Sequence, residues 1–368
     1  MATEGLALKR IDHLRMFVGN ARQSAYFYRN AFGFEVIAYA GLETGVRHEA
    51  CYVLRQGQIT FVLASPLSGD HPDAQRLILH GDGVQSIALE VGNVPAAFEC
   101  AVARGAKPAR PPQTIEDEFG AYEFAEIRAY GDTTHTLVDR SRYKGIFAPG
   151  FLPIDPDRYS PVSFHPVGLK AIDHVVANVE EGKMGDWVDY YSKIMGFSVL
   201  ASFDDKDIST EYSALMSKVV ADGRGRIKFP INEPAKSRRR SQIDEFLQFY
   251  GGPGVQHIAM ATGDIVRSVR AMVKNDVSFL KVPPAYYDML PQRVGAVKED
   301  MRELAELGIL VDRDDEGYLL QIFTKPVEDR PTLFFEIIQR HGARSFGKGN
   351  FKALFEAIER EQAKRGTL

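Results

Sequence analysis

The sequence contains few of the features that mark secreted, membrane-spanning or nucleic-acid-binding proteins. Its two cysteines, Cys51 and Cys100, lie far apart and form neither a metal-type nor a redox pair, which suits a reducing compartment. The formal net charge is only −4 and gives no reason to expect nucleic acid or an anionic membrane as a partner. The basic run 237–241 has no second basic cluster beside it, so we interpret it as a solvated loop.

Long hydrophobic runs are also missing. No apolar run reaches membrane-spanning length, and the first residues show no basic segment followed by an apolar core. We therefore expect a soluble, cytoplasmic protein without membrane partners. Its hydrophobic content of 45% and charged content of 26% are those of an ordinary globular protein. Because 368 residues are many for a single core, two domains are expected.

The chain carries one pattern of motifs twice. The triplet Ile-Asp-His opens a predicted strand at 11–20 and again at 172–181, and the segment 83–91 is echoed by 254–262. Each of these four segments precedes a helical pattern, and the predicted helices are 24–34, 187–197, 94–104 and 265–275. Two echoes in the same order indicate a tandem duplication.

A proline-rich stretch, 145–168, lies between the two repeats. Its five prolines remove backbone donors and fix φ, which favours an extended connector over a helix. We place the boundary near 161–168 and expect an N-terminal domain at 1–160 and a C-terminal domain at 161–368. Each repeat reads as a strand, a helix and then several strands, which predicts an α+β protein.

Three residues of the second repeat are of metal-binding types. His174 and His257 belong to predicted strands, and Glu336 lies inside the apolar run 332–338, which forms a predicted hairpin with 318–324. A carboxylate among aromatic and β-branched residues is costly to bury without a partner or a metal. Two imidazoles and one carboxylate are the donor set of the facial triad that holds Fe(II) and leaves positions open.

Each of these residues alone is more often a core residue with satisfied hydrogen bonds than a metal ligand. The duplication decides between these two explanations. The equivalent positions in the first repeat are expected at His13, Ser86 and Asp139. Serine in place of the second histidine removes a strong ligand. We therefore predict a metal site in the second repeat and a scaffold role for the first. Beyond both repeats, 351–364 is predicted to form an amphipathic helix with Asn350 as its N-cap.

Four stretches carry a family resemblance: KFPINEP (228–234), SQIDEFLQFYGGPGVQHIAM (241–260), GYLLQIFTKPVEDRPTLFFEIIQRHG (317–342) and FGKGNFKALFEAIEREQ (346–362). They resemble the 4-hydroxyphenylpyruvate dioxygenase family of the vicinal oxygen chelate superfamily. The likeness spans nearly the whole chain and is weaker in the first repeat. It implies tandem modules of βαβββ units that form two open barrels, the first degenerate and without metal, followed by a C-terminal lid helix.

The resemblance also implies a reaction. His174, His257 and Glu336 match the Fe(II) ligands of the family, and O2 is the co-substrate. An arylpyruvate would chelate the iron through its α-keto oxygen and carboxylate. Oxidative decarboxylation, ring hydroxylation and side-chain migration would convert 4-hydroxyphenylpyruvate to homogentisate and CO2, a step in tyrosine and phenylalanine catabolism. The family further suggests a homodimer or homotetramer.

The matching motifs assign a pocket as well. The family's catalytic polar residues fall on Gln242, Gln256, Asn232 and Gln321, and its substrate-binding residues on Ser217, Pro230, Phe323, Phe346, Asn350 and Phe351. The resemblance implies that the amides orient the phenol by hydrogen bonds. It also implies that Phe323 and Phe351 bracket the aromatic ring.

Three alternatives stay open at this point. A hydroxymandelate synthase uses the same iron and substrate but hydroxylates the benzylic carbon, and the proline and asparagine of 228–234 favour the ring-hydroxylating family over it. An extradiol catechol dioxygenase would need additional acid–base histidines beside the metal. A member that only binds ligands is typically a short single module without a ligand triad.

Overall fold

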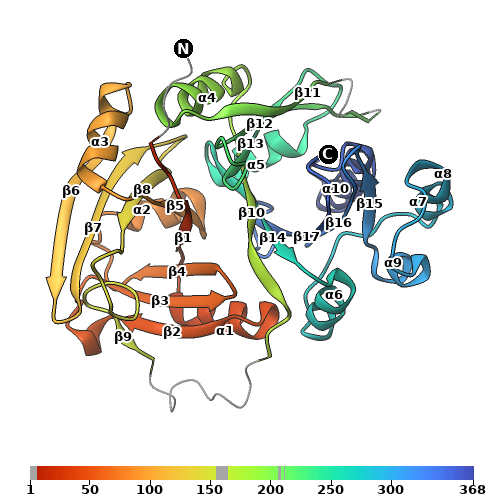
Figure 1. Cartoon of the computed structure of the whole chain (residues 1–368). Helices are drawn as coiled ribbons and strands as arrows, with labels where there is room; N and C mark the ends of the chain where they lie inside the picture. Colours follow the sequence, from red (N-terminus) through yellow and green to blue (C-terminus); the bar gives the residue numbers. More distant parts are fainter. Residues whose placement is uncertain (1–5, 155–164, 206–208, 211) are drawn as a thin grey trace.

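The computed structural model describes residues 6–154, 165–205, 209–210 and 212–368 (Figure 1). The first sheet contains, in spatial order, β6 (Pro108–Asp117), β7 (Gly120–Arg128), β8 (Thr134–Asp139), β5 (Gly83–Glu90), β1 (Arg10–Phe17), β4 (Ile59–Pro66), β3 (Glu49–Gln56), β2 (Glu35–Ala40) and β9 (Leu152–Pro153). The second sheet contains β11 (Ser198–Phe203), β12 (Leu215–Ala221), β13 (Lys228–Pro234), β10 (Leu169–Asn178), β14 (Gly254–Thr262), β17 (Phe334–His341), β16 (Tyr318–Phe323) and β15 (Leu310–Arg313).

Helices flank both sheets. They are α1 (Ala21–Phe32), α2 (Ala74–His80), α3 (Val94–Ala103), α4 (Met184–Tyr190), α5 (Gln242–Tyr250), α6 (Ile265–Lys274), α7 (Ala285–Asp288), α8 (Leu290–Arg293), α9 (Met301–Leu307) and α10 (Phe351–Arg365). We call the first sheet with α1–α3 the first module and the second sheet with α4–α10 the second module. In Figure 1 the first module, coloured red to yellow, lies on the left, and the second lies above and to the right. The predicted α+β class, two open curled sheets and a C-terminal helix, is confirmed.

The predicted helices form where local signals mark their ends. Asn20 caps α1 by accepting from the backbone N–H of Gln23, and Gly33 ends it with a left-handed φ of 69°. In the second module α4 continues through a π-helical turn, Tyr191–Met195, and Gly196 ends it with a φ of 73°. The helix begins at Met184, three residues before the predicted start. The helices α2, α5, α7, α8 and α9 were not predicted.

Strand pairing shows the duplication directly. β1 pairs in parallel with β4 and antiparallel with β5, and β10 has the same two relations with β13 and β14. Strand β8 pairs in parallel with β5, as β17 does with β14. The central strands of the two modules are therefore arranged alike, and the register of each pair identifies equivalent residues.

This register corrects one predicted equivalence. Glu336 pairs with Ala259, two positions beyond His257, and Thr136 pairs with Ala88, two positions beyond Ser86. Thr136, and not Asp139, is therefore the counterpart of Glu336. Asp139 lies three positions further along the same strand, and an odd offset places a side chain on the opposite face of a sheet.

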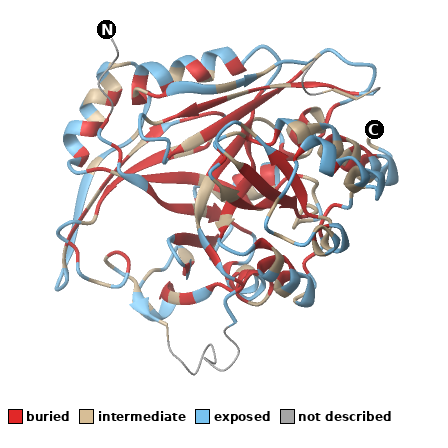
Figure 2. Cartoon of the chain, turned by 45° about the vertical axis from the view of Figure 1, so that its right-hand side comes forward, coloured by how far each residue is buried: buried red, intermediate tan, exposed pale blue. Residues whose placement is uncertain are grey.

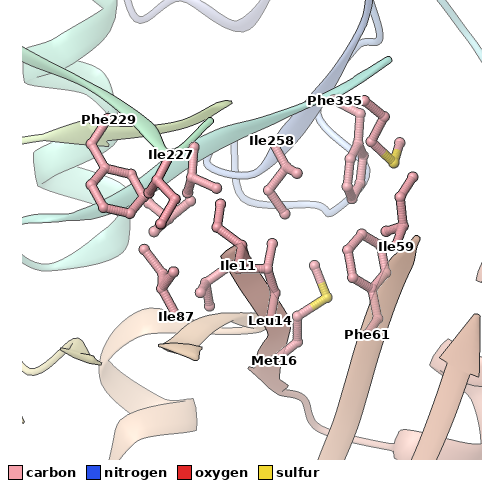
Figure 3. Packing of buried hydrophobic residues seen from close by; sticks show 14 of the residues in the cluster. Ile11, Leu14, Met16, Ile59, Phe61, Ile87, Ile227, Phe229, Ile258 and Phe335 are labelled. Atoms are coloured by element: carbon pink, nitrogen blue, oxygen red, sulfur yellow. The ribbon is translucent and has the colours of Figure 1, made fainter. Parts of the chain in front are cut away.

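The two modules share one hydrophobic core. Figure 3 shows Leu14 and Phe61 of the first module close to Ile258 and Phe335 of the second. The Phe335 ring is fully buried, and its centroid lies 6.2 Å from that of Phe61. Buried residues gather along the strands, whereas the outer faces of the helices are exposed (Figure 2). Because side chains alternate along a strand, anchoring Phe335 here turns its neighbour Glu336 to the other face.

The proline-rich connector joins the sheets. The first sheet ends at Pro153 and the second begins at Leu169, while 161–164 of the predicted boundary lie outside the described residues. The basic run is exposed at 237–240, as a solvated loop should be, but Ser241 is buried. In the described part of the chain, no helix has the length and apolar character needed to cross a membrane.

Candidate metal centre

Three donor residues converge from three neighbouring strands of the second sheet. His174 lies on β10, His257 on β14 and Glu336 on β17, and the side chains of all three are buried. The carboxylate oxygen Oε2 of Glu336 lies 3.1 Å from Nε2 of His174 and 3.5 Å from Nε2 of His257. One ligand atom from each residue lies within 4.8 Å of the others. These atoms can therefore converge on one ion.

The strand register explains this convergence. Ala259 of β14 pairs with His174 on one side and with Glu336 on the other, so these two donors lie in one row across the sheet. His257 lies two residues before Ala259 and therefore projects from the same face. Three strands thus place three donors on one face although the residues lie far apart in the sequence.

The electrostatics of the three groups suit a cation. Burial alone would raise the pKa of the Glu336 carboxyl, but the two imidazoles outweigh burial and lower this pKa to about 2. Burial lowers the pKa of His257, whereas for His174 the carboxylates of Glu336 and Asp173 overcome burial and raise the pKa. An ionised carboxylate is therefore buried beside two imidazoles, and this donor set fits a divalent metal ion.

The donors lie in a pocket that also contains almost all of the other predicted site residues. Those that line it are Ser217, Pro230, Asn232, Gln242, Gln256, Gln321, Phe323, Phe346 and Phe351. Asn350 is the exception: it is buried beside the pocket and does not line it. Of the lining residues in the described part of the chain, only His174, His257 and Glu336 are titratable. The remaining wall is made of apolar groups, amides and one hydroxyl.

Amide side chains connect the donors to the pocket wall. The Gln256 carbonyl oxygen lies 3.1 Å from Nδ1 of His257, and the Gln256 amide nitrogen donates to the Gln242 oxygen at 3.4 Å. The Gln321 amide nitrogen donates to Oε1 of Glu336 at 3.4 Å. Buried amides need such partners. Gln256 and Gln321 therefore each combine a contact to a donor with a position in the wall.

Asn350 differs from its predicted role as an N-cap. Its side chain makes no capping hydrogen bond to α10. Instead its amide nitrogen donates to the Gln321 oxygen at 3.2 Å, and its oxygen accepts from the Tyr286 hydroxyl at 2.6 Å. Arg293 donates to the same oxygen at 3.0 Å. The capping prediction is wrong because these tertiary partners, two of them on the unpredicted helices α7 and α8, hold the side chain.

Gln242 owes its position to the end of the basic run. Ser241 and Asp244 form a capping box in which each side chain accepts from the backbone N–H of the other. This box fixes the start of α5, and Gln242 is the first residue of that helix. The buried Ser241 is thus the helix N-cap, which explains why it differs from the exposed loop before it.

The sequence analysis did not identify several apolar wall residues, namely Val176, Phe203, Leu215, Val219, Phe334, Leu354 and Phe355. The alternation of strand side chains could have found most of them. Val176 follows His174 by two residues and Phe334 precedes Glu336 by two, so each shares a face with its donor. Leu354 and Phe355 belong to α10, whose docking over the pocket carries no comparable local signal.

Comparison with known proteins places this geometry in a family. The model of the Glyoxalase/Bleomycin resistance protein/Dioxygenase superfamily matches residues 10–128 and 171–322. The 4-hydroxyphenylpyruvate dioxygenase of Dictyostelium discoideum is 49% identical, and the match covers 98% of this chain and 100% of that protein. The chain belongs to the 4-hydroxyphenylpyruvate dioxygenase family.

Other relatives are similarly close. The 4-hydroxyphenylpyruvate dioxygenase of Caenorhabditis briggsae is 48% identical over 98% of this chain and 94% of its own length. Among solved structures, a triple mutant of 4-hydroxymandelate synthase from Streptomyces coelicolor superposes with a TM-score of 0.86 at 33% identity, covering 97% of this chain and 99% of that one. The family therefore has a structural neighbour that bears the name of one of the alternative reactions.

Proposed function

We propose that this dioxygenase converts 4-hydroxyphenylpyruvate and O2 to homogentisate and CO2 in the pocket of the second module. One observation carries the proposal: two buried imidazoles and a buried carboxylate converge at the wall of a pocket otherwise lined by apolar side chains, amides and one hydroxyl. Family membership supports the same reaction, because the relatives carry its name.

His174, His257 and Glu336 are the proposed ligands of Fe(II). The donor set fits this ion, because neutral imidazoles and one carboxylate leave positions open for substrate and oxygen. Bound there, Fe(II) would supply the activation of dioxygen that side chains cannot provide. The charges also balance: the ion, the Glu336 carboxylate and the substrate carboxylate sum to zero, which an apolar pocket tolerates better than a bare cation.

The protein's own residues would bind and orient the substrate. The keto-acid end would face the three donors, and the phenol end would face the amides of Gln242, Gln256 and Asn232. Gln321 would keep Glu336 in place through its hydrogen bond. Since no further titratable group lines the described pocket, the side chains beyond the donors act by positioning and not by general acid–base catalysis.

Aromatic and aliphatic side chains would keep water from the reacting atoms. Phe323 and Phe351 lie on different elements of the pocket wall, β16 and α10, and would bracket the ring. Helix α10 would act as a lid, because Phe351, Leu354 and Phe355 all face the pocket. Unchanged hydrogen exchange in α10 on ligand binding would contradict the lid.

Hydroxymandelate synthase is the second candidate, since its solved structure superposes closely on this chain. The two candidates differ in product. Fe(II)-loaded protein should be incubated with 4-hydroxyphenylpyruvate, ascorbate and air, and the products separated by chromatography. We expect homogentisate. 4-Hydroxymandelate would keep the metal site but refute the assignment of the ring-positioning residues, and no product without oxygen uptake would refute the catalytic proposal.

The remaining alternatives have less support. An extradiol catechol dioxygenase would need acid–base side chains beside the metal, and the described pocket presents amides there. A ligand-binding member without catalysis would consume no oxygen with an arylpyruvate. Oxygen uptake with 4-hydroxyphenylpyruvate but none with catechols would exclude both.

We also infer a cytoplasmic homodimer or homotetramer built from domains 1–160 and 161–368. The two free thiols fit a reducing compartment, and the change of sheet between Pro153 and Leu169 supports the domain boundary. Sedimentation analysis would test the oligomeric state, and cell fractionation the location.

A further inference from the structure

A buried carboxylate lies behind the proposed metal ligand His174. The Asp173 side chain, 8% exposed, has its Oδ1 at 2.7 Å from Nδ1 of His174. A carboxylate accepts, so Nδ1 carries the proton in this contact, and Nε2 is the ring nitrogen on the side of Glu336. This contact thus selects the nitrogen that His174 presents to the metal position.

Asp173 is itself held by a bidentate arginine. Nε and Nη2 of Arg340 donate to the two Asp173 oxygens at 2.9 and 3.0 Å, and Nζ of Lys228 lies 3.1 Å from Oδ1. The fork of a guanidinium fixes a carboxylate in position and in plane. Arg340 lies four residues after Glu336 on β17, so one strand supplies a proposed ligand and the support of another.

The same arginine also holds a wall of the pocket. Nη1 of Arg340 donates to the carbonyl of Ser345 at 2.6 Å, and its guanidinium lies over the Phe346 ring at 5.4 Å. The Phe346 ring packs edge-on against the His174 imidazole with a centroid distance of 5.2 Å. His174, Asp173, Arg340 and Phe346 thus form a closed network of contacts.

The first module contains the same network of contacts, but without the other two donors of the proposed metal site. Oδ2 of Asp12 lies 2.7 Å from Nδ1 of His13, and Nε of Arg140 donates to both Asp12 oxygens at 3.0 Å. The Arg140 guanidinium lies 4.3 Å from the centre of the Phe147 ring, which packs edge-on against His13 at 5.3 Å. Because this network of contacts is present in both modules, it stabilises the fold in both. The first module therefore supplies a matched control for any effect on metal binding.

We infer that Asp173 and Arg340 are positioning residues of the proposed metal site. Asp173 fixes His174 so that Nε2 faces the metal, and Arg340 fixes both Asp173 and the Phe346 wall. The inference rests on the proposed function, because it assumes that the three donors bind a metal. Loss of Asp173 should weaken metal binding by roughly 10- to 100-fold, the usual effect of removing a partner of a ligating histidine.

Co(II) binding to the full chain tests this inference without relying on activity. Affinity is measured by competition with a chelator, and the visible absorption spectrum reports the ligand field. D173A should bind Co(II) roughly 10- to 100-fold more weakly with an altered spectrum. D173N should lose less, because its amide oxygen can still accept from His174, and R340K should also lose less than D173A.

The control variants are D12A and D12N in the first module. They should lower the unfolding midpoint as the Asp173 variants do, yet keep Co(II) affinity within about twofold. Wild-type affinity and spectrum in D173A, or in both D173N and R340K if D173A does not fold, would overturn the inference. Equal losses in D12A and D173A would overturn it too, because the effect would then be general destabilisation. If wild-type protein binds no Co(II), the proposed metal site itself fails.

Discussion

The two modules share one architecture but differ in what fills the face that carries the donors. At the positions of His174, His257 and Glu336, the first module has His13, Ser86 and Thr136. The Ser86 and Thr136 hydroxyls lie 2.6 Å apart and bond to each other. The two short side chains thus hydrogen-bond to each other where the second module has an imidazole and a carboxylate whose possible ligand atoms lie within 4.8 Å of one another.

The pocket side of the first module is filled as well. Arg15 pairs with Ser86 as Val176 pairs with His257, so an arginine occupies the place of a pocket-wall valine. Its guanidinium donates to Glu49 at 2.6 Å and to Gln85 at 2.9 Å. The comparison shows that the same strands support either an open polar site or a closed ion-pair network, depending on a few inward-facing side chains.

The largest expected effect comes from removing one of the two donors that the first module lacks. E336A should abolish metal binding and reduce turnover by at least roughly 10³-fold, because metal catalysis contributes several kcal/mol. The matched variant T136A should keep turnover within about twofold and lose only about 1 kcal/mol of stability, the value of one hydrogen bond. Steady-state oxygen uptake measures the first effect and denaturant unfolding the second. Comparable turnover losses in both variants would contradict the assignment.

An arginine at position 176 of the second module, the counterpart of Arg15, should prevent metal binding at the three donors. V176R places a cation on the face that carries the donors, and repulsion should weaken metal binding by roughly 100-fold or more. V176M, which adds length without charge, is the control and should retain binding. Isothermal titration with Co(II) measures both. Tight Co(II) binding by a folded V176R protein would show that Arg15 is not what distinguishes the two faces.

These comparisons also show what the sequence could predict. The paired Ile-Asp-His triplets, the helices ended by Gly33 and Gly196, and the hairpin around Glu336 all depend on local signals, and they are observed. The counterpart of Glu336 was predicted wrongly because it depends on pairing register between distant strands. The N-cap role of Asn350 was predicted wrongly because its side chain hydrogen-bonds to tertiary partners and not to the backbone of its own helix. The sequence did not predict the positioning role of Arg340 because its partner Asp173 is distant in sequence.

A smaller effect concerns α10, which has no counterpart in the first module. Arg365 near its end donates to the Glu245 carboxylate at 2.8 and 3.2 Å, and the Glu245 side chain is only 4% exposed. R365A would leave this carboxylate without its charged partner, so we expect a loss of about 1–3 kcal/mol. K364A removes an exposed pair and should cost under about 1 kcal/mol. Limited proteolysis of α10 compares them, and equal cleavage rates would refute the role of Arg365.

The smallest expected effect lies where the modules meet. Burial and the nearby Asp82 carboxylate of the first module raise the pKa of Glu328 well above its usual 4.5. A raised pKa contributes stability that is fully present below the unfolded-state value and is lost as pH rises through the folded-state value. E328Q should therefore raise the melting temperature near neutral pH, and this gain should vanish by pH 4. D329N, at an exposed neighbour, should show no such dependence. A gain independent of pH would contradict the explanation.

The central claim is that one of two duplicated modules holds a metal, and that His257 and Glu336 make the difference. Metal stoichiometry tests it most directly. Co(II) titration of the wild-type chain should reach one ion per chain, and H257S/E336T, which installs the residues of the first module, should bind none while remaining folded by circular dichroism. Two ions per wild-type chain, or one ion retained in the double variant, would contradict the account.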